Sequence, residues 1–181
     1  TVTFFIALFI FVSSFAKTVE IIAFSDFHGH VDEDTSAKGK SLGIKKFVTA
    51  IKNEEKNSNF DDIVVAGGDD YQGTALSALT KGAPVSNMMK EIHVSASAVG
   101  NHEFDWGIDC FKKWQKDGGF PFLAANIINR KTKKPVKWAK PYIIVVKDGV
   151  KVAFIGLATT ETPNLTAKKN LKNLEFTDSA K

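Results

Sequence analysis

The sequence predicts an α/β fold built on a largely parallel β-sheet. Two observations support this prediction. Short apolar runs typical of strands alternate along the chain with segments that have helical periodicity. Polar side chains also recur directly after several of these apolar runs. Because the carboxyl ends of parallel strands meet at one edge of a sheet, we expect those side chains to share one crevice.

The first half of the chain contributes two expected strands and three expected helices. Val19–Phe24 and Ile63–Ala66 are short apolar runs, each followed directly by polar or glycine residues. Residues 41–56 place apolar side chains on one side and Lys or Glu on the other, which is typical of an amphipathic helix. Two shorter helices are expected over Thr74–Thr80 and Pro84–Ile92, where proline suits the first helical turn.

The next segment continues the alternation of strands and helices. Val94–Val99 is expected to be the third strand and Phe122–Ala125 the fourth. Between them, Trp106–Lys116 has helical spacing and is stopped by Gly118-Gly119. This order of elements is the pattern of a parallel sheet with helical crossovers.

A hairpin is expected late in the chain. Tyr142–Val146 and Val150–Leu157 are apolar strands joined at Asp148-Gly149, a strong signal for a tight turn between antiparallel strands. The remaining segment, Asn164–Lys181, is rich in Lys and Asn and has no clear period, so it is expected to be a loop or an interrupted continuation.

The N-terminal residues are expected to form a secretory signal peptide rather than part of the fold. Phe4–Val12 is a continuous apolar run, and small residues follow it up to Ala16. A cut there gives a signal segment of residues 1–16, without its basic n-region, and a mature domain of residues 17–181. A buried strand or helix is the alternative interpretation. The run is shorter than the roughly 18–20 residues that span a bilayer, so no stable membrane span is expected.

The composition of the chain indicates which kinds of binding partner to expect. The chain has 24 Lys and Arg against 20 Asp and Glu, a net charge of +4 that is scattered rather than striped. This mild excess suits an anionic ligand, and no nucleic-acid polymer is expected as a partner. A single cysteine excludes a disulfide scaffold and a four-cysteine zinc module.

Three polar motifs follow three successive expected strands. Asp26 and His28 are two residues apart, so both side chains face the same side of an extended segment. Asp69 follows Gly67-Gly68, and Asn101 and His102 follow Gly100. Carboxylate, imidazole and amide groups suit Zn, Mn, Fe or Ni. Each motif alone is weak, but three at neighbouring strand ends indicate a metal site.

The motifs DFHGH, GGDD and GNHEFD, in this order and spacing, resemble those of the calcineurin-like metallophosphoesterases. AVGNHEFDWG, FPFLAANI and VAFIGLATTETP are similar to the branch of secreted 5′-nucleotidases and 2′,3′-cyclic-nucleotide phosphodiesterases. The likeness runs from Val19 to Pro163. It implies an α-β-β-α sandwich, of which residues 17–181 would form the front, N-terminal part of the catalytic domain.

The resemblance also implies a site with two divalent metal ions, Zn, Mn or similar, whose bridging hydroxide attacks phosphorus. Asp26 and His28 would bind the first metal, Asp69 would bridge both, and Asn101 would bind the second. His102 would be the catalytic imidazole. Asp105 would be its partner. His30 would either approach the substrate phosphate or cap a loop, and Asp70 is the alternative bridging ligand.

The implied function is a secreted, periplasmic or extracellular phosphohydrolase that acts on nucleotides. Another dimetal ester hydrolase, such as a thiosulfate-ester hydrolase, and a non-catalytic truncated module are the alternatives. Family sites also use two further His and often a Gln from downstream, whereas no His follows His102 here. We therefore expect an under-coordinated second metal and an inactive fragment. The native metal, the exact nucleotide and the oligomeric state stay open.

Other conspicuous residues are expected to be structural. Cys110 lies among aromatic residues and is interpreted as an inert core thiol, and His93 as a residue of a helix–strand junction. Phe104 and Trp106 are expected to pack behind the site. Gly39-Lys40-Ser41 resembles the end of a phosphate-binding loop but lacks its earlier glycine, so it is interpreted as a solvated loop.

Overall fold

The computed structural model describes residues 17–36, 41–58 and 62–179. The expected signal segment lies outside these residues, as does the Gly39-Lys40 part of the loop that resembles a phosphate-binding motif. The prediction of a signal peptide therefore stays a prediction.

A four-stranded parallel sheet in the order β1-β2-β3-β4 forms the centre of the fold. Its strands are β1 (Glu20–Phe24), β2 (Asp62–Ala66), β3 (Ala96–Ala98) and β4 (Phe122–Leu123). The predicted α/β class with a largely parallel sheet is confirmed. Strands β3 and β4 are shorter than predicted, because only Ala96–Ala98 and Phe122–Leu123 pair with neighbouring strands.

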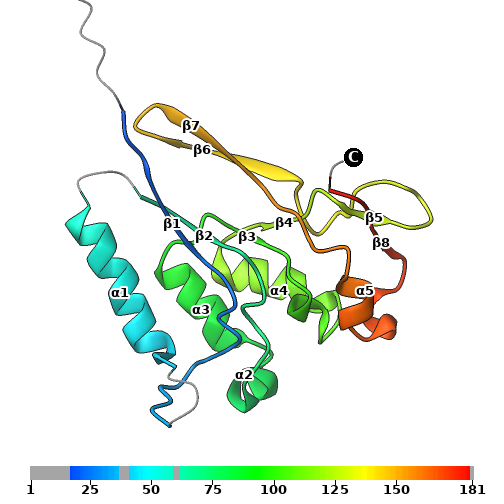
Figure 1. The fold of residues 1–181 in the computed structure, drawn as a ribbon, viewed down its shortest axis with the longest axis horizontal. Coiled ribbons are helices and arrows are strands. Elements are labelled where there is room, and N and C mark those ends of the chain that lie inside the picture. Colours follow the sequence, from blue (N-terminus) through cyan, green and yellow to red (C-terminus); the bar gives the residue numbers. More distant parts are fainter. Residues whose placement is uncertain (1–16, 37–40, 59–61, 180–181) are drawn as a thin grey trace, which may run out of the picture.

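Three helices lie along one side of this sheet, and the hairpin lies on the other side (Figure 1). They are α1 (Gly43–Asn57), α3 (Ala83–Glu91) and α4 (Asp109–Gly118), and the short α2 (Ala75–Thr80) precedes α3. Because the strands follow one another without reversal, right-handed crossovers place every connecting helix on the same face. Among the described helices, none combines the length and the apolar character that crossing a bilayer would need.

Aromatic side chains fill the space between the sheet and the helices. Tyr71 stacks on Trp114 with ring centroids 3.9 Å apart, and Phe111 packs on Phe122 at 4.9 Å. Phe104 is fully buried and packs on Phe111, as predicted for a residue behind the site. This layer supports the loops that leave the carboxyl ends of β2 and β3.

The predicted hairpin is confirmed as β6 (Tyr142–Lys147) and β7 (Val150–Ile155). Asp148 and Gly149 both have positive φ, 52° and 78°, as a two-residue type I′ turn requires. The inward-facing side chains are half-buried, whereas the outward-facing ones are more exposed. Among the latter, Tyr142 and Ile155 are 54% and 68% exposed.

The segment after Asn164 is an interrupted continuation of the fold, one of the two expected alternatives, rather than a loop. Residues 164–179 contribute to α5 (Thr162–Leu165) and contain the 3₁₀ turn η2 (Lys168–Leu171) and the strand β8 (Leu174–Phe176). Strand β8 pairs antiparallel with β5 (Ile127–Asn129), which was also not predicted. Strands of three residues are too short for periodicity to reveal, and their pairing partners lie far apart in sequence.

The start of α4 also differs from the prediction. The helix begins at Asp109 rather than Trp106, because residues 102–104 form a 3₁₀ turn, η1, directly after β3. Its end agrees with the prediction, since Gly119 adopts a left-handed φ of 76° that caps the helix. The turn η1 carries the GNHEFD motif, so this difference affects the arrangement of the site.

Candidate functional site

The loops after β1 and β2 remain paired beyond the ends of the strands. The Asp26 N–H donates to the Gly68 carbonyl at 3.0 Å, and the His28 N–H donates to the Asp69 carbonyl at 3.0 Å. The Gly29 N–H continues the series by donating to the Asp70 carbonyl at 2.8 Å. These bonds hold the DFHGH and GGDD motifs side by side at the carboxyl edge of the sheet.

Three predicted metal ligands have left-handed backbone conformations. The φ angles are 56° at Asp26, 50° at His28 and 57° at Asp69. Outside glycine this conformation costs roughly 1–2 kcal/mol per residue, although Asp tolerates it better than most. Such conformations persist where surrounding bonds enforce them, and they cluster at functional sites.

Asp26 and His28 form a pair whose donor atoms converge. His28 Nε2 lies 3.6 Å from Asp26 Oδ1, and His28 Nδ1 lies 3.0 Å from the Gln72 carbonyl oxygen. If Nδ1 carries the proton and donates to that carbonyl, the Nε2 lone pair faces the carboxylate. This is the orienting bond that metal-binding histidines usually make through their other ring nitrogen.

The donor chemistry of this pair fits a divalent metal ion, but the described residues do not form a complete ligand set. Within residues 17–36, 41–58 and 62–179, no group of three His, Cys, Asp or Glu side chains is arranged to hold an ion. The residues present therefore fit part of one metal position. Asp26 is also the more open member, with 63% of its side chain exposed against 31% for His28.

Asp69 connects the first two motifs with the third. Its Oδ1 accepts the His102 N–H at 2.8 Å. A Cβ at Gly100 would lie 2.2 Å from the same Oδ1, so only glycine leaves room for this carboxylate. The glycine of the GNHEFD motif is thus explained by the close approach of Asp69.

Asp70 is the alternative bridging ligand, and its side chain is buried in the protein. It is fully buried, and its Oδ1 accepts the Phe27 N–H at 3.4 Å, whereas its Oδ2 has no hydrogen-bond partner among the described residues. Burial, followed by the nearby charge of Glu103, raises the pKa of Asp70 well above its usual range. The geometry therefore favours Asp69, whose carboxylate is only partly buried and accepts the His102 N–H.

His102 and Asp105 form a hydrogen-bonded dyad. His102 Nδ1 lies 2.7 Å from Asp105 Oδ2. Partial burial works to lower the pKa of His102, but the hydrogen bond and negative charge of Asp105 outweigh it, and the pKa is raised. The bond at Nδ1 leaves Nε2 as the ring nitrogen available to a substrate.

The dyad lies beside the first ligand pair. The rings of His102 and His28 meet edge to face with centroids 5.0 Å apart. The structure therefore brings together Asp26, His28, Asp69 and the dyad, which come from the ends of three neighbouring strands. Asn101 immediately precedes the dyad at the start of η1 and is partly buried.

Two supporting residues come from the segment after Asn164, whose sequence has no clear period. Thr166 Oγ1 donates to the Asn101 carbonyl at 3.0 Å, and Asn170 Nδ2 donates to the Asp105 carbonyl at 2.9 Å. Each bond spans 65 residues of sequence. Lone Thr and Asn residues in a Lys-rich segment carry no pattern that would have revealed these contacts.

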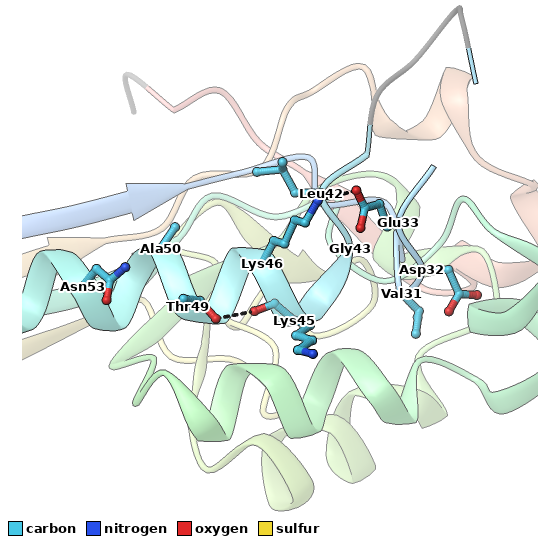
Figure 2. A pocket seen from close by; sticks show the side chains of 10 residues that line it. All are labelled: Val31, Asp32, Glu33, Leu42, Gly43, Lys45, Lys46, Thr49, Ala50 and Asn53. Atoms are coloured by element: carbon cyan, nitrogen blue, oxygen red, sulfur yellow. Dashed lines mark hydrogen bonds and ion pairs between the residues drawn. The ribbon is translucent and has the colours of Figure 1, made fainter. Parts of the chain in front are cut away.

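His30 lies on the wall of a cavity next to the ligand pair. The cavity measures about 300 Å³, and Asp26, Phe27 and His30 are among its lining residues. A neighbouring cavity of about 580 Å³ lies beside the first turns of α1. Figure 2 shows that Lys46 points to Glu33 there, whereas Lys45 points away from both. None of the predicted site residues lines this second cavity.

The residues expected to be structural behave accordingly. Burial raises the pKa of the Cys110 thiol, and a neutral thiol is a weak nucleophile. His93 is exposed and adopts a left-handed φ of 51° in the turn between α3 and β3. Trp106 is partly buried and packs edge-on against Trp114.

Comparison with known proteins agrees with the motifs. The chain is 31% identical over 154 residues to a 5′-nucleotidase of Vibrio parahaemolyticus, a match covering 85% of this chain and 27% of that protein. It is 29% identical over 182 residues to endonuclease YhcR of Bacillus subtilis, covering 90% of this chain and 15% of that protein.

A solved structure of another protein has a similar fold. The structure of a 5′-nucleotidase precursor from Thermus thermophilus matches with a TM-score of 0.74 and 25% identity, covering 88% of this chain and 32% of that one. The chain thus spans less than a third of each of these relatives. Residues 19–179 match the sequence profile of one family, which describes almost all of the chain. The chain belongs to the calcineurin-like phosphoesterase family.

Proposed function

We propose that this chain is the N-terminal part of the catalytic domain of a secreted, dimetal phosphohydrolase that acts on nucleotides. The observation that carries the proposal is the convergence of the Asp26–His28 pair, Asp69 and the His102–Asp105 dyad at one edge of the sheet. Family membership supports phosphoester hydrolysis, and a 5′-nucleotidase among the relatives supports a nucleotide substrate.

In the full protein, Asp26, His28, Asp69 and Asn101 would supply part of the ligand set for two divalent ions, with Asp69 as the proposed shared ligand. When bound, such ions supply positive charge to a phosphoryl group and lower the pKa of water toward neutrality. A mixed set of carboxylate, imidazole and amide groups suits Zn or Mn. The Gln72 carbonyl keeps the His28 ring in the orientation that presents Nε2.

His102 would donate a proton to the leaving group. Its raised pKa keeps a larger fraction of the imidazole protonated near neutral pH, so Nε2 can donate to the departing oxygen. Asp105 holds the ring through Nδ1 and favours the charged form. Asn170 in turn donates to the Asp105 carbonyl, which supports the turn that carries the dyad.

His30 is proposed to contact the substrate phosphate. It is exposed and shares a cavity wall with Asp26, so a phosphoryl group near the ligand pair would lie within reach of its ring. The net charge of +4 is compatible with an anionic substrate.

The activity test uses the full protein that carries these residues. With added Mn or Zn, we expect release of phosphate from AMP and cleavage of 2′,3′-cyclic AMP or bis(p-nitrophenyl) phosphate, and a rate about 10²–10⁴-fold lower in the His102→Ala variant. Residues 17–181 alone should be inactive, because the second ion would keep only a shared carboxylate and an amide oxygen. Cleavage of a thiosulfate ester or of an RNA or DNA strand, but not of nucleotides, would refute the proposed substrate class.

Export is tested separately. We expect the exported protein to begin at Lys17, after cleavage behind Ala16, because the apolar run and small residues suit a signal peptide. N-terminal sequencing of the exported protein checks this. Recovery of the protein inside the cell with residues 4–12 intact would contradict secretion and leave the hydrolase proposal unaffected.

A further inference from the structure

Three backbone N–H groups at the candidate site converge on one buried carboxylate. Glu103 Oε2 accepts the Asp69 N–H at 2.9 Å and the Gly100 N–H at 2.8 Å. Its Oε1 accepts the Asp70 N–H at 2.9 Å. The Glu103 residue is fully buried, so these contacts are shielded from solvent.

This arrangement differs from the junction between the first two loops. There, the N–H groups of Asp26 and His28 meet carbonyl oxygens of the neighbouring loop, and the backbone satisfies itself. Between the loops after β2 and β3, the N–H groups of Asp69, Asp70 and Gly100 all donate toward the same place. Each would cost roughly 1–3 kcal/mol if it were buried without an acceptor.

A carboxylate suits this cradle better than any other side chain. Successive N–H groups that point into a concavity form a nest for an anion. A carboxylate has two oxygens that both accept, whereas the amide of Gln has one accepting oxygen and one NH₂ group that only donates. A Gln at position 103 would therefore leave at least one of the three N–H groups facing a donor.

The contacts of Asp69 extend this network to the dyad. The Asp69 backbone donates to Glu103, while its side-chain Oδ1 accepts the N–H of His102, the residue directly before Glu103. The Asp69 carboxylate and the His102 backbone are thus fixed to each other through two routes. Moving Glu103 would move both.

We propose that Glu103 is a positioning residue that sets the distance between the Asp69 loop and the Asn101–His102 turn. It acts through the backbone and touches neither the substrate nor the reacting atoms. The inference rests on the proposed function in one respect: Asp69 must be a metal ligand for its position to affect metal affinity. The claim about the three N–H groups stands on the geometry alone.

Asn126 provides a matched control. It is also buried, and it also serves several backbone groups, since its Nδ2 donates to the Ala158 and Thr177 carbonyls and its Oδ1 accepts the Ala158 N–H. These contacts join the segment after β4 to the segments after β7 and β8. None of them involves the three site loops.

The experiment compares the unaltered chain with Glu103→Gln and Asn126→Ala. Amide hydrogen exchange at Asp69, Asp70 and Gly100 is followed by NMR without metal, and Mn²⁺ affinity is measured by titration. We expect Glu103→Gln to speed exchange at these amides and to raise the Kd for Mn²⁺ by about 10–100-fold, the usual effect of losing an outer hydrogen-bond partner. Asn126→Ala should lower the Tm and leave both site readouts unchanged.

Unchanged exchange and Mn²⁺ affinity in Glu103→Gln would overturn the proposal. So would equal losses in Glu103→Gln and Asn126→Ala, because the effect would then reflect general destabilisation. If the unaltered chain binds no Mn²⁺, its incomplete ligand set explains the result, and the exchange of the three amides alone decides the role of Glu103. If the full protein binds none either, the proposed metal centre fails.

Discussion

The carboxyl edge of the parallel sheet and the outer face of the hairpin have opposite construction. At the carboxyl edge, polar residues from three loops are joined by side-chain and backbone hydrogen bonds across 33 to 43 residues of sequence. On the outer face of the hairpin, side chains such as Ile144 and Ile155 are apolar and more than half exposed. The loops at the carboxyl edge therefore hold one another in place, whereas the position of the outer hairpin face depends only on the pairing of its two strands.

This contrast shows where substitutions should affect activity and where they should not. At the carboxyl edge, a change at one residue removes a partner from another loop, so the effects should be large and coupled. On the hairpin, an outward-facing side chain has few partners to lose. The apolar character of both hairpin faces is typical of a sheet layer between two other layers, as in an α-β-β-α sandwich.

The largest effect is expected for Asp69→Asn in the full protein. The substitution keeps the shape of the side chain but removes the charge that two cations would share, so metal content and turnover should both fall below detection. Metal analysis and phosphate release from AMP measure the two losses. Normal metal content with a normal rate would exclude Asp69 as the bridging ligand.

A smaller effect is expected for His102→Ala, which should lower the rate by about 10²–10⁴, the usual contribution of one acid–base group. Metal content should stay at the level of the unaltered protein, because His102 is assigned a role in proton transfer. Loss of metal in this variant would show instead that His102 is a ligand.

The hairpin provides the opposite test. Phe154→Ala changes an inward-facing side chain of β7 and should lower the free energy of unfolding by about 2 kcal/mol, less than for a fully buried Phe. Ile155→Lys changes the adjacent, outward-facing residue and should alter it by about 0.5 kcal/mol or less. Urea denaturation of the chain compares the two. A larger loss for Ile155→Lys would mean that the outer face is packed in solution.

The smallest effect is expected on a single property, the pKa of His102. Burial works to lower the pKa of His102, and Asp105→Asn removes the hydrogen-bonded negative charge that contributes most to raising it. The pKa should therefore fall, although the charges of Asp69 and Glu103 remain. The imidazolium would then be lost at lower pH than in the unaltered chain. NMR titration of the His102 ring in the metal-free chain measures the shift, with His93 as an internal reference outside the site. An unchanged or higher pKa would contradict the dyad.

The sequence by itself determined the parallel α/β fold, the hairpin and the family, because these depend on local patterns: apolar runs, helical spacing, an Asp-Gly turn and motifs at strand ends. It also identified every residue for which a ligand or proton-transfer role is proposed. Only the tertiary structure showed that Asp70 is fully buried, whereas Asp69, one residue earlier and in a left-handed conformation, is partly buried and accepts the His102 N–H. Only the tertiary structure revealed the contacts of Glu103, Thr166 and Asn170. Each of these side chains bonds to a backbone group of another segment. A local sequence pattern does not indicate which distant N–H or carbonyl group a side chain will contact.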